Sequence, residues 1–299
     1  MSVGARYTHK WMVRTIEDNG ISVPGVGEVF FIANPGFGVA EQILPPPAPP
    51  APHAIRDYDG LEFRLQKRLS NNWSLNTSYL FSRLYGNYGG LASSDEPNAT
   101  TGVGRTSPNV DRYFDALYMS FDDSGTRQPV LGRLATDRPH QFKAQVTYSA
   151  PWGTAVGLDG WIESGSPLQS QLSWRGFPVF FSGRGDLGRT PTYSQLNLVV
   201  QHDVKLLGGR KVNFNVNVTN LFDQKSAINI NNTPWRDSFN VPGLSSDASN
   251  AYFFNGFDAA ALAAQIRASG GTMRPNPLFN LPSVYQSRRE IRLGVRYSF

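Results

Sequence analysis

The sequence predicts an all-β chain whose antiparallel strands form part of a membrane-spanning β-barrel. The clearest sign is the last nine residues, in which apolar side chains (Ile291, Leu293, Val295, Tyr297 and Phe299) alternate with polar or small ones. A two-residue period places the two sets on opposite faces of a strand. Similar segments recur along the chain, and short and very long connections alternate between them. Lipid on one face and water on the other explain this pattern.

The first three expected strands lie at 2–17, 58–69 and 73–81. Their apolar rows comprise Val3, Ala5, Tyr7, Trp11 and Val13, then Leu61, Phe63 and Leu65, then Trp73, Leu75, Tyr79 and Phe81. Polar residues such as Arg6, Lys10 and Glu62 occupy the alternate positions of the first two. The short Ser-Asn-Asn sequence at 70–72 favours a tight turn between the second and third strands.

The remaining five expected strands lie at 140–150, 156–163, 196–204, 212–219 and 291–299. Each has an apolar row, and the rows comprise Phe142, Ala144, Val146 and Tyr148; Val156, Leu158 and Ile162; Leu196, Leu198, Val200 and Val204; Val212, Phe214, Val216 and Val218; and the terminal set given above. Turns at 151–153 and 207–210 join two of the pairs. The sequence therefore predicts about eight strands.

The connections differ strongly in length. Those at 18–57, 86–137, 166–192 and 223–285 are far longer than the turns. Short periplasmic turns and long extracellular loops are typical of bacterial outer-membrane barrels. A short amphipathic helix is expected at 258–268, with Leu262 and Ile266 on one face.

Charged side chains on the apolar rows test this orientation. Lys67 and His202 lie near short turns, and Arg83 and Arg289 lie near long loops, where a charge costs less than at the membrane midplane. His9 lies nearer the middle of its strand, and we interpret it as a neutral imidazole.

Composition excludes several other classes. The chain has 299 residues, 40% of them hydrophobic, no cysteine and a net charge of +5. It lacks an apolar run of the roughly 18 residues that a membrane helix needs. Its basic residues are scattered, which argues against a nucleic-acid partner. No signal peptide is recognisable at the first residues, so we expect the chain to be a fragment of a longer protein.

Candidate ligand contacts lie in the expected outer loops, where aromatic and guanidinium groups occur together. They are Trp174, Arg175, Arg184, Arg189, Trp235 and Arg236. Such groups suit stacking and the binding of carboxylate or phosphate. The same groups suit packing between loops, and both interpretations stay open.

The sequence indicates neither catalysis nor a cofactor. Its four histidines are scattered and lack metal-ligand spacing, so no metal site is expected. No catalytic triad, paired carboxylates or phosphate-binding glycine loop is recognisable, and we do not expect an enzyme.

The chain also resembles the C-terminal barrel part of TonB-dependent outer-membrane receptors, in particular the Oar-like group. The resemblance covers nearly the whole chain, and its blocks are GEVFFIANPG at 27–36, YDGLE at 58–62, SNNWSL at 70–75, SRLYGNY at 82–88, TDRPHQ at 136–141, GRGD at 183–186 and NVTNLFD at 217–223. It implies that 1–299 forms about eight strands of a barrel of about 22 strands. The plug domain and signal peptide of such receptors are not recognisable in the chain.

The resemblance implies a function for the complete protein. Such receptors lie in the outer membrane of Gram-negative bacteria and import a scarce solute with energy from the TonB complex, which engages an N-terminal part not recognisable here. The implied partners are outer-membrane lipid, an unknown imported ligand and the barrel-assembly machinery. This machinery would read the terminal strand through Val295, Tyr297 and Phe299, so loss of 297–299 is expected to impair assembly.

Three alternatives stay open. One is a structural or adhesive surface barrel without transport. Another is a self-contained eight-stranded barrel, either an enzyme or a small porin, although a barrel of that size fills its interior with side chains. The last is a soluble β-sandwich, in which the apolar rows would face a second sheet.

Overall fold

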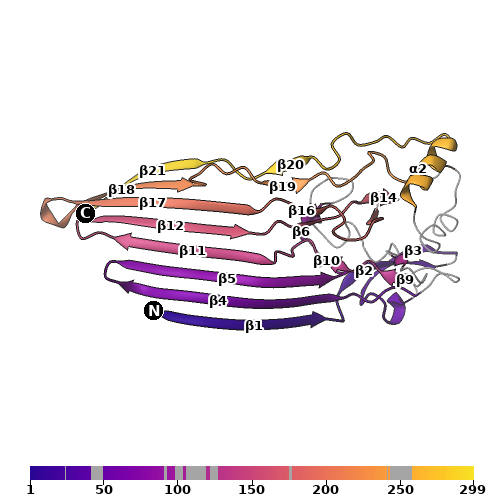
Figure 1. Ribbon diagram of the computed structural model, residues 1–299, viewed down its shortest axis with the longest axis horizontal. Coiled ribbons are helices and arrows are strands. Elements are labelled where there is room, and N and C mark those ends of the chain that lie inside the picture. Colours follow the sequence, from indigo (N-terminus) through magenta and orange to yellow (C-terminus); the bar gives the residue numbers. More distant parts are fainter. Residues whose placement is uncertain are drawn as a thin grey trace.

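A large antiparallel sheet dominates the computed structural model, which describes residues 1–23, 25–41, 50–90, 93–97, 104–105, 119–121, 127–174, 177–240, 242 and 258–299. Eight long strands lie side by side in chain order (Figure 1). They are β1 (Ser2–Met12), β4 (Arg56–Ser70), β5 (Trp73–Gly86), β11 (His140–Ser149), β12 (Thr154–Glu163), β17 (Tyr193–Lys205), β18 (Lys211–Thr219) and β21 (Glu290–Ser298). A ninth, β10 (Gly132–Arg133), pairs with the end of β5. The eight predicted strands are confirmed.

The first strand is shorter than its sequence pattern suggested. Its last pair with β4 joins Met12 to Arg56, where β4 begins. Beyond Met12 the chain has no neighbouring strand to pair with, and it enters a separate hairpin at Glu17. Residues 13–16 therefore belong to a loop, and Glu17 begins the first strand of the separate hairpin.

The turns and loops segregate to opposite ends of the sheet. Both termini and the turns after β4, β11 and β17 lie at one end, and the long connections lie at the other (Figure 1). The β4–β5 turn holds Asn71 and Asn72 at φ of 52° and 67°. Two positive φ values suit a two-residue hairpin, and asparagine tolerates them better than most residues.

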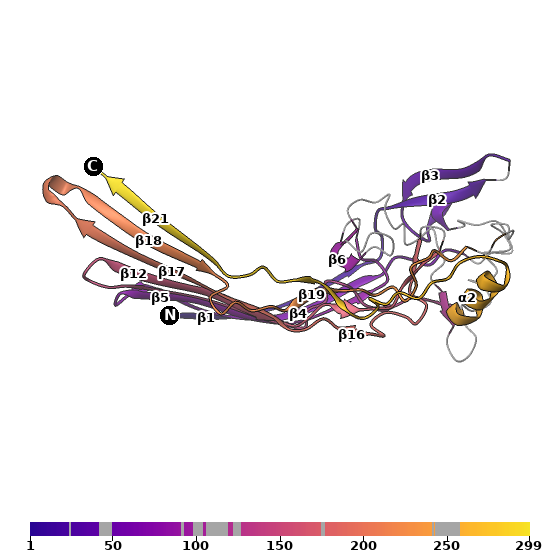
Figure 2. The same ribbon diagram turned by 90° about the horizontal axis from the view of Figure 1, so that it is seen from above.

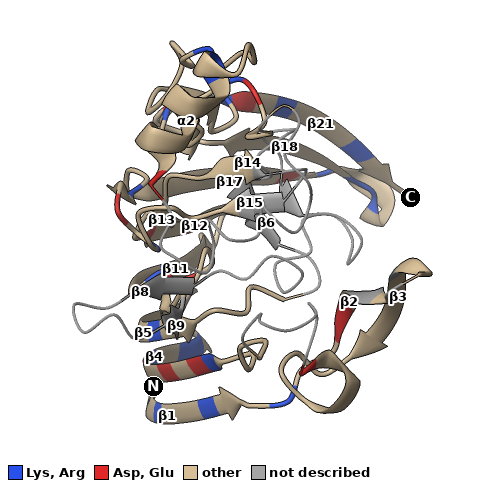
Figure 3. Cartoon of the chain, turned by 90° about the vertical axis from the view of Figure 1, so that its right-hand side faces the viewer, with Lys and Arg blue, Asp and Glu red and all other residues tan. Residues whose placement is uncertain are grey.

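The sheet is curved and open. Viewed from the loop end, its strands follow an arc from β1 to β21, and these two edges do not meet (Figure 3). No second layer of sheet or helix covers the apolar rows of the described strands, since many of their large side chains are exposed. The soluble sandwich, which needs such a layer, does not fit this arrangement.

The long connections carry small elements of their own (Figure 2). The two-stranded pairs are β2 (Glu17–Val23) with β3 (Gly27–Ala33), β6 (Ser93–Pro97) with β7 (Gly104–Arg105), β8 (Met119–Phe121) with β9 (Arg127–Pro129), β13 (Pro167–Leu168) with β16 (Gly188–Arg189), β14 (Leu172–Trp174) with β15 (Phe177–Val179), and β19 (Ala227–Ile230) with β20 (Pro282–Tyr285). The 3₁₀ helix η1 (Gly38–Ala40) lies in the first long connection, whereas a second one, η2 (Leu207–Gly209), forms the short turn between β17 and β18. Sequence patterning did not reveal these hairpins, because most are too short to show a period.

The expected helix is confirmed as α2 (Ala259–Ala268). The Asp258 side chain caps it by accepting the N–H of Ala261 at 2.9 Å, which satisfies one of the free donors of the first turn. Leu262 and Ile266 lie in a buried cluster with Leu172 and Phe239, which we call the loop core. No helix in the described part of the chain is long and apolar enough to cross a membrane.

Candidate functional site

One face of the sheet is apolar and unprotected. Its exposed side chains include Val3, Tyr7, Trp11, Leu61, Phe63, Tyr79, Phe81, Phe142, Ile162, Phe214, Ile291 and Leu293. In β21, Val295 is 69% and Tyr297 51% exposed, and Phe299, directly after it, is fully exposed. A continuous apolar surface of this extent requires a partner, and hydrocarbon matches its band-like form.

Two ionisable residues on this apolar face, Lys67 and His202, have local hydrogen-bond partners. The Lys67 ammonium donates to the carbonyl oxygens of Ser70 and Trp73 at 2.6 and 2.7 Å and lies 4.0 Å from the Trp73 ring centroid. His202 and Thr154 form a hydrogen bond of 2.9 Å. Both lie near the turns, as the sequence predicted.

His9 has a partner that sequence patterning did not find. Its Nδ1 lies 2.7 Å from Oδ1 of Asp59, the residue directly opposite on β4. The Tyr7 hydroxyl donates to the same carboxylate oxygen at 2.8 Å, and Arg83 is the cross-strand neighbour of Asp59 on β5. The polar atoms of His9 are therefore partly satisfied within the sheet.

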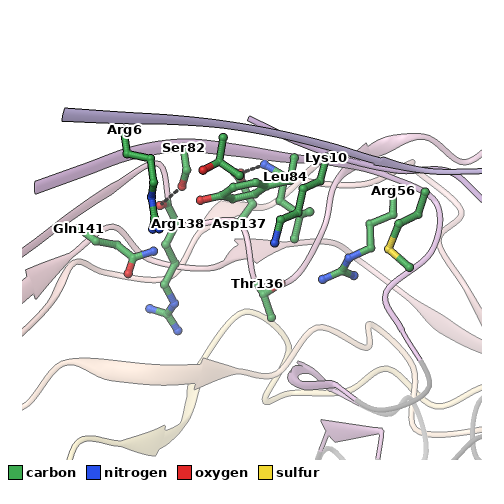
Figure 4. A pocket seen from close by; sticks show the side chains of 12 residues that line it. Arg6, Lys10, Arg56, Ser82, Leu84, Thr136, Asp137, Arg138 and Gln141 are labelled. Atoms are coloured by element: carbon green, nitrogen blue, oxygen red, sulfur yellow. Dashed lines mark hydrogen bonds between the residues drawn. The ribbon is translucent and has the colours of Figure 1, made fainter. Parts of the chain in front are cut away.

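The opposite, polar face contains a cavity of about 650 Å³ near the loop end (Figure 4). Side chains of β1, β4, β5 and the segment entering β11 line it. Four of them are cations: Arg6, Lys10, Arg56 and Arg138. We call this space the cationic cavity. The sequence pattern placed Arg6 and Lys10 on the polar side of the first strand. It did not group them with Arg56 and Arg138, because these residues come together only through the register between strands.

Asp137 fixes the floor of the cationic cavity. Its side chain is fully buried and accepts the Leu84 N–H at 2.6 Å. Arg189 pairs with its carboxylate at 2.5 Å and also donates to the carbonyl oxygens of Asp137 and Gly165 at 2.7 and 3.0 Å. These contacts join the loops after β5 and β12, and they give Arg189 a structural role.

The next residues fix the entry to β11. Arg138 forms an ion pair with Glu163 at 3.0 Å, and the Pro139 carbonyl accepts the Ser82 N–H at 2.9 Å. The sequence stretch around Arg138, Pro139 and His140 therefore holds a loop against the rim of the sheet.

Arg184, another predicted ligand contact, also packs between loops. Its guanidinium donates to the carbonyl oxygens of Val130 and Asn87, both at 3.3 Å, and lies 4.6 Å from the Phe180 ring centroid. It occupies a turn with Gly185 on one side, where φ is +81°.

The other predicted ligand contacts are dispersed. Trp174 ends β14, while Arg175 lies outside the described residues. Trp235 packs on the loop core, with its ring 5.0 Å from Phe239 in an edge-on contact, and Arg236 is exposed. Trp235 packs on the loop core, whereas Arg184 and Arg189 bind other loop segments, and ligand contact stays a prediction for all six.

The Asn-Leu-Phe-Asp stretch at 220–223 connects the ends of two strands. The buried Asn220 side chain donates to the carbonyl oxygens of Gln224 and Ser287, both at 2.9 Å. Asp223 pairs with Arg288 at 2.7 Å. The hydrogen bonds from the Arg288 guanidinium, and then from the Arg289 N–H, hold the pKa of the Asp223 carboxyl far below its usual value. This segment therefore anchors the exit of β18 to the entry of β21.

A similar ion pair supports the loop core. Arg274 binds Asp237 through both its side chain and its backbone N–H, with the shortest contacts at 2.6 Å. The Arg274 guanidinium lowers the pKa of the Asp237 carboxyl.

Within the described residues, no group of three His, Cys, Asp or Glu side chains is arranged to hold a metal ion.

Comparison with known proteins relates the chain to a TonB-dependent transporter. No family model matches the sequence. The TonB-dependent transporter Oar of Myxococcus xanthus is 28% identical over 307 residues, which cover 99% of this chain and 26% of that protein. The chain is a relative of part of a TonB-dependent transporter. The resemblance seen in the sequence is thereby confirmed, together with the outer-membrane β-barrel class and the Gram-negative outer membrane as its location.

Comparison with solved structures gives two outer-membrane transport proteins with a partial likeness to the chain. One is the ferric-catecholate import receptor Fiu of Escherichia coli K12, with a TM-score of 0.42 and 12% identity, over 99% of this chain and 25% of that one. The other is the Escherichia coli outer-membrane transporter YddB, with a TM-score of 0.46 and 11% identity, over 77% of this chain and 27% of that one. The chain spans about a quarter of the length of each protein it matches.

Proposed function

We propose that residues 1–299 form the C-terminal part of the barrel wall of a TonB-dependent receptor, and that the complete protein imports a scarce solute. The observation that carries this proposal is the 28% identity to the transporter Oar across 99% of the chain. The TonB complex supplies the energy and engages a part of the complete protein outside this chain. The proposal assigns the chain no catalytic step.

The form of the sheet supports a wall that other strands complete. β1 and β21 each have one edge without a partner strand in the described sheet. Unpaired edges inside a bilayer leave N–H and C=O groups without hydrogen bonds, so membrane sheets close into barrels. The curvature of the sheet provides the start of such a closure, and its polar face becomes the inner wall (Figure 3).

The terminal strand supports a partner in assembly. Val295, Tyr297 and Phe299 form an exposed row that ends at the turn side of the sheet. We assign this row to recognition by the barrel-assembly machinery, after which the same side chains face lipid.

Import is tested by following which solutes cells remove from their medium. Cells with an intact gene, cells with the gene deleted and cells with inactive TonB are grown in one defined medium, and mass spectrometry records solute depletion. We expect at least one solute to remain in the medium of both mutants. Restoring the intact gene to the deletion mutant should lead to depletion of that solute again. Equal depletion by all strains, together with loss of cell–cell adhesion on deletion, contradicts import and favours the adhesive barrel.

A further inference from the structure

We propose that the imported solute carries carboxylate or phosphate groups and that the cationic cavity binds them. This inference rests on the proposed import function, because it assigns a chemistry to the solute that enters. The cavity lies on the polar face, at the end of the sheet where the long loops are, so an arriving solute meets it early (Figure 4). Its volume of about 650 Å³ suits a small molecule.

Lys10 is the central group of this proposal. Its side chain lines the cavity, and its ammonium has no hydrogen-bond or ion-pair partner among the described residues. On β1 it follows Arg6 and Thr8 at every second position, so the three side chains share the polar face. The Lys10 side chain is exposed, so its ammonium is accessible to a solute that enters the cavity.

Arg6 adds a second unbalanced charge. It pairs with Glu62 at 2.9 Å, but Arg64 binds the other oxygen of the same carboxylate at 2.8 Å. Two guanidinium groups therefore share one negative charge. The group of Arg6, Glu62 and Arg64 therefore has one surplus positive charge, which β1 and β4 share.

The acidic group of the cavity does not cancel these charges. Asp137 is fully buried, and Arg189 and Arg133 pair with it at 2.5 and 3.5 Å. Its carboxylate is directed into the contacts that hold the loops, so two cations offset it. Arg138 is likewise offset by its ion pair with Glu163 at 3.0 Å, so the surplus positive charge of the lining comes from Lys10 and from Arg6 with its neighbour Arg64.

Neutral donors complete the binding surface. Tyr58, Thr136 and Gln141 line the cavity beside the cations. In Figure 4 the side chains of Lys10, Arg138 and Thr136 extend toward the same space. Hydroxyl and amide donors beside cations are suited to carboxylate or phosphate oxygens, which accept several hydrogen bonds each.

The test measures binding to the complete receptor, purified from outer membranes in detergent. Isothermal titration calorimetry at low ionic strength compares three probes: citrate, inorganic phosphate and the uncharged sugar trehalose. We expect citrate, phosphate or both to bind, and trehalose not to bind. The two anions distinguish a carboxylate ligand from a phosphate ligand.

Variants locate the binding. Lys10→Gln should weaken anion binding about tenfold, the value of one charge-assisted hydrogen bond, while Lys10→Arg should retain it. Lys143→Gln is the matched control, because Lys143 is exposed on the same face of the sheet and does not line the cavity. Heat-modifiable mobility in electrophoresis shows that each variant is folded.

The inference is wrong if neither anion binds better than trehalose, or if Lys143→Gln weakens binding as much as Lys10→Gln. Binding in detergent needs no TonB and no energy. The absence of anion binding therefore does not contradict the proposed import. Unchanged solute uptake in the TonB mutant contradicts import, and it does not affect the binding result.

Discussion

Asp137→Ala should detach the loop that enters β11 from the rim of the sheet. The buried Asp137 carboxylate accepts the Leu84 N–H at 2.6 Å and pairs with Arg189 at 2.5 Å. A buried donor left without an acceptor costs about 1–3 kcal/mol, and removal of one partner from a buried ion pair costs about 3–5 kcal/mol. The Arg189 side chain keeps 31% exposure and two carbonyl partners, so the second cost is reduced. We expect a total loss of about 3 kcal/mol.

Urea unfolding of the complete receptor in detergent, followed by tryptophan fluorescence and by heat-modifiable mobility, measures this loss. Asp137→Asn keeps an acceptor for the Leu84 N–H and removes only the charge, so its effect should be about half as large. Glu290→Gln is the control, because its ion pair with Arg292 is exposed, and its loss should cost less than about 0.5 kcal/mol. An Asp137→Ala protein as stable as this control would refute the assigned role of the carboxylate.

Three further predictions concern the terminal strand and the loops. Phe299→Ala should reduce the heat-modifiable, folded form in outer membranes, and an unchanged folded fraction contradicts the assembly role. The fold lowers the pKa of the Asp223 carboxyl below its unfolded value of 3.8. The pairing with Arg288 therefore stabilises the protein fully at pH values above 3.8, and this stabilisation is lost as the pH falls below 3.8. Asp223→Asn should therefore flatten the loss of stability on acidification, measured as the unfolding midpoint against pH. Leu262→Ala should destabilise the loop core by about 2–5 kcal/mol, seen as faster local hydrogen exchange with an unchanged sheet, while exposed Leu207→Ala should have no effect.

The strands were predictable because each carries its own signal. In β18, Val212, Phe214, Val216 and Val218 alternate with polar residues, and a pattern of this length leaves one strand orientation that puts the apolar row outward. The α2 helix was predictable for the same reason, since Leu262 and Ile266 are four residues apart and both are buried. Local periodicity identifies a strand or helix wherever its two faces differ in polarity.

The loops and the cavity were less predictable, because their structure depends on contacts between distant segments. Arg184 and Arg189 looked like ligand contacts in the sequence, yet one binds carbonyl groups up to 97 positions away and the other binds Asp137. The cationic cavity joins β1 to a segment about 130 residues later in the chain. Sequence showed that Arg6 and Lys10 share a face, but the register of four strands was needed to place Arg138 beside them.

The two faces of the sheet differ in what a cation without a protein partner indicates about ligand binding. On the apolar face, a polar or charged group that lacks a partner within the protein is costly in hydrocarbon, and Lys67 and His9 accordingly have hydrogen-bond partners. On the polar face water solvates an ion, so stability does not require a partner for Lys10. Lys10 lines the cavity without a partner among the described residues, so its ammonium can exchange bound water for the oxygens of a solute. The position of Lys10 on the polar face, rather than the number of cations nearby, is therefore what makes the cationic cavity a binding site for anions.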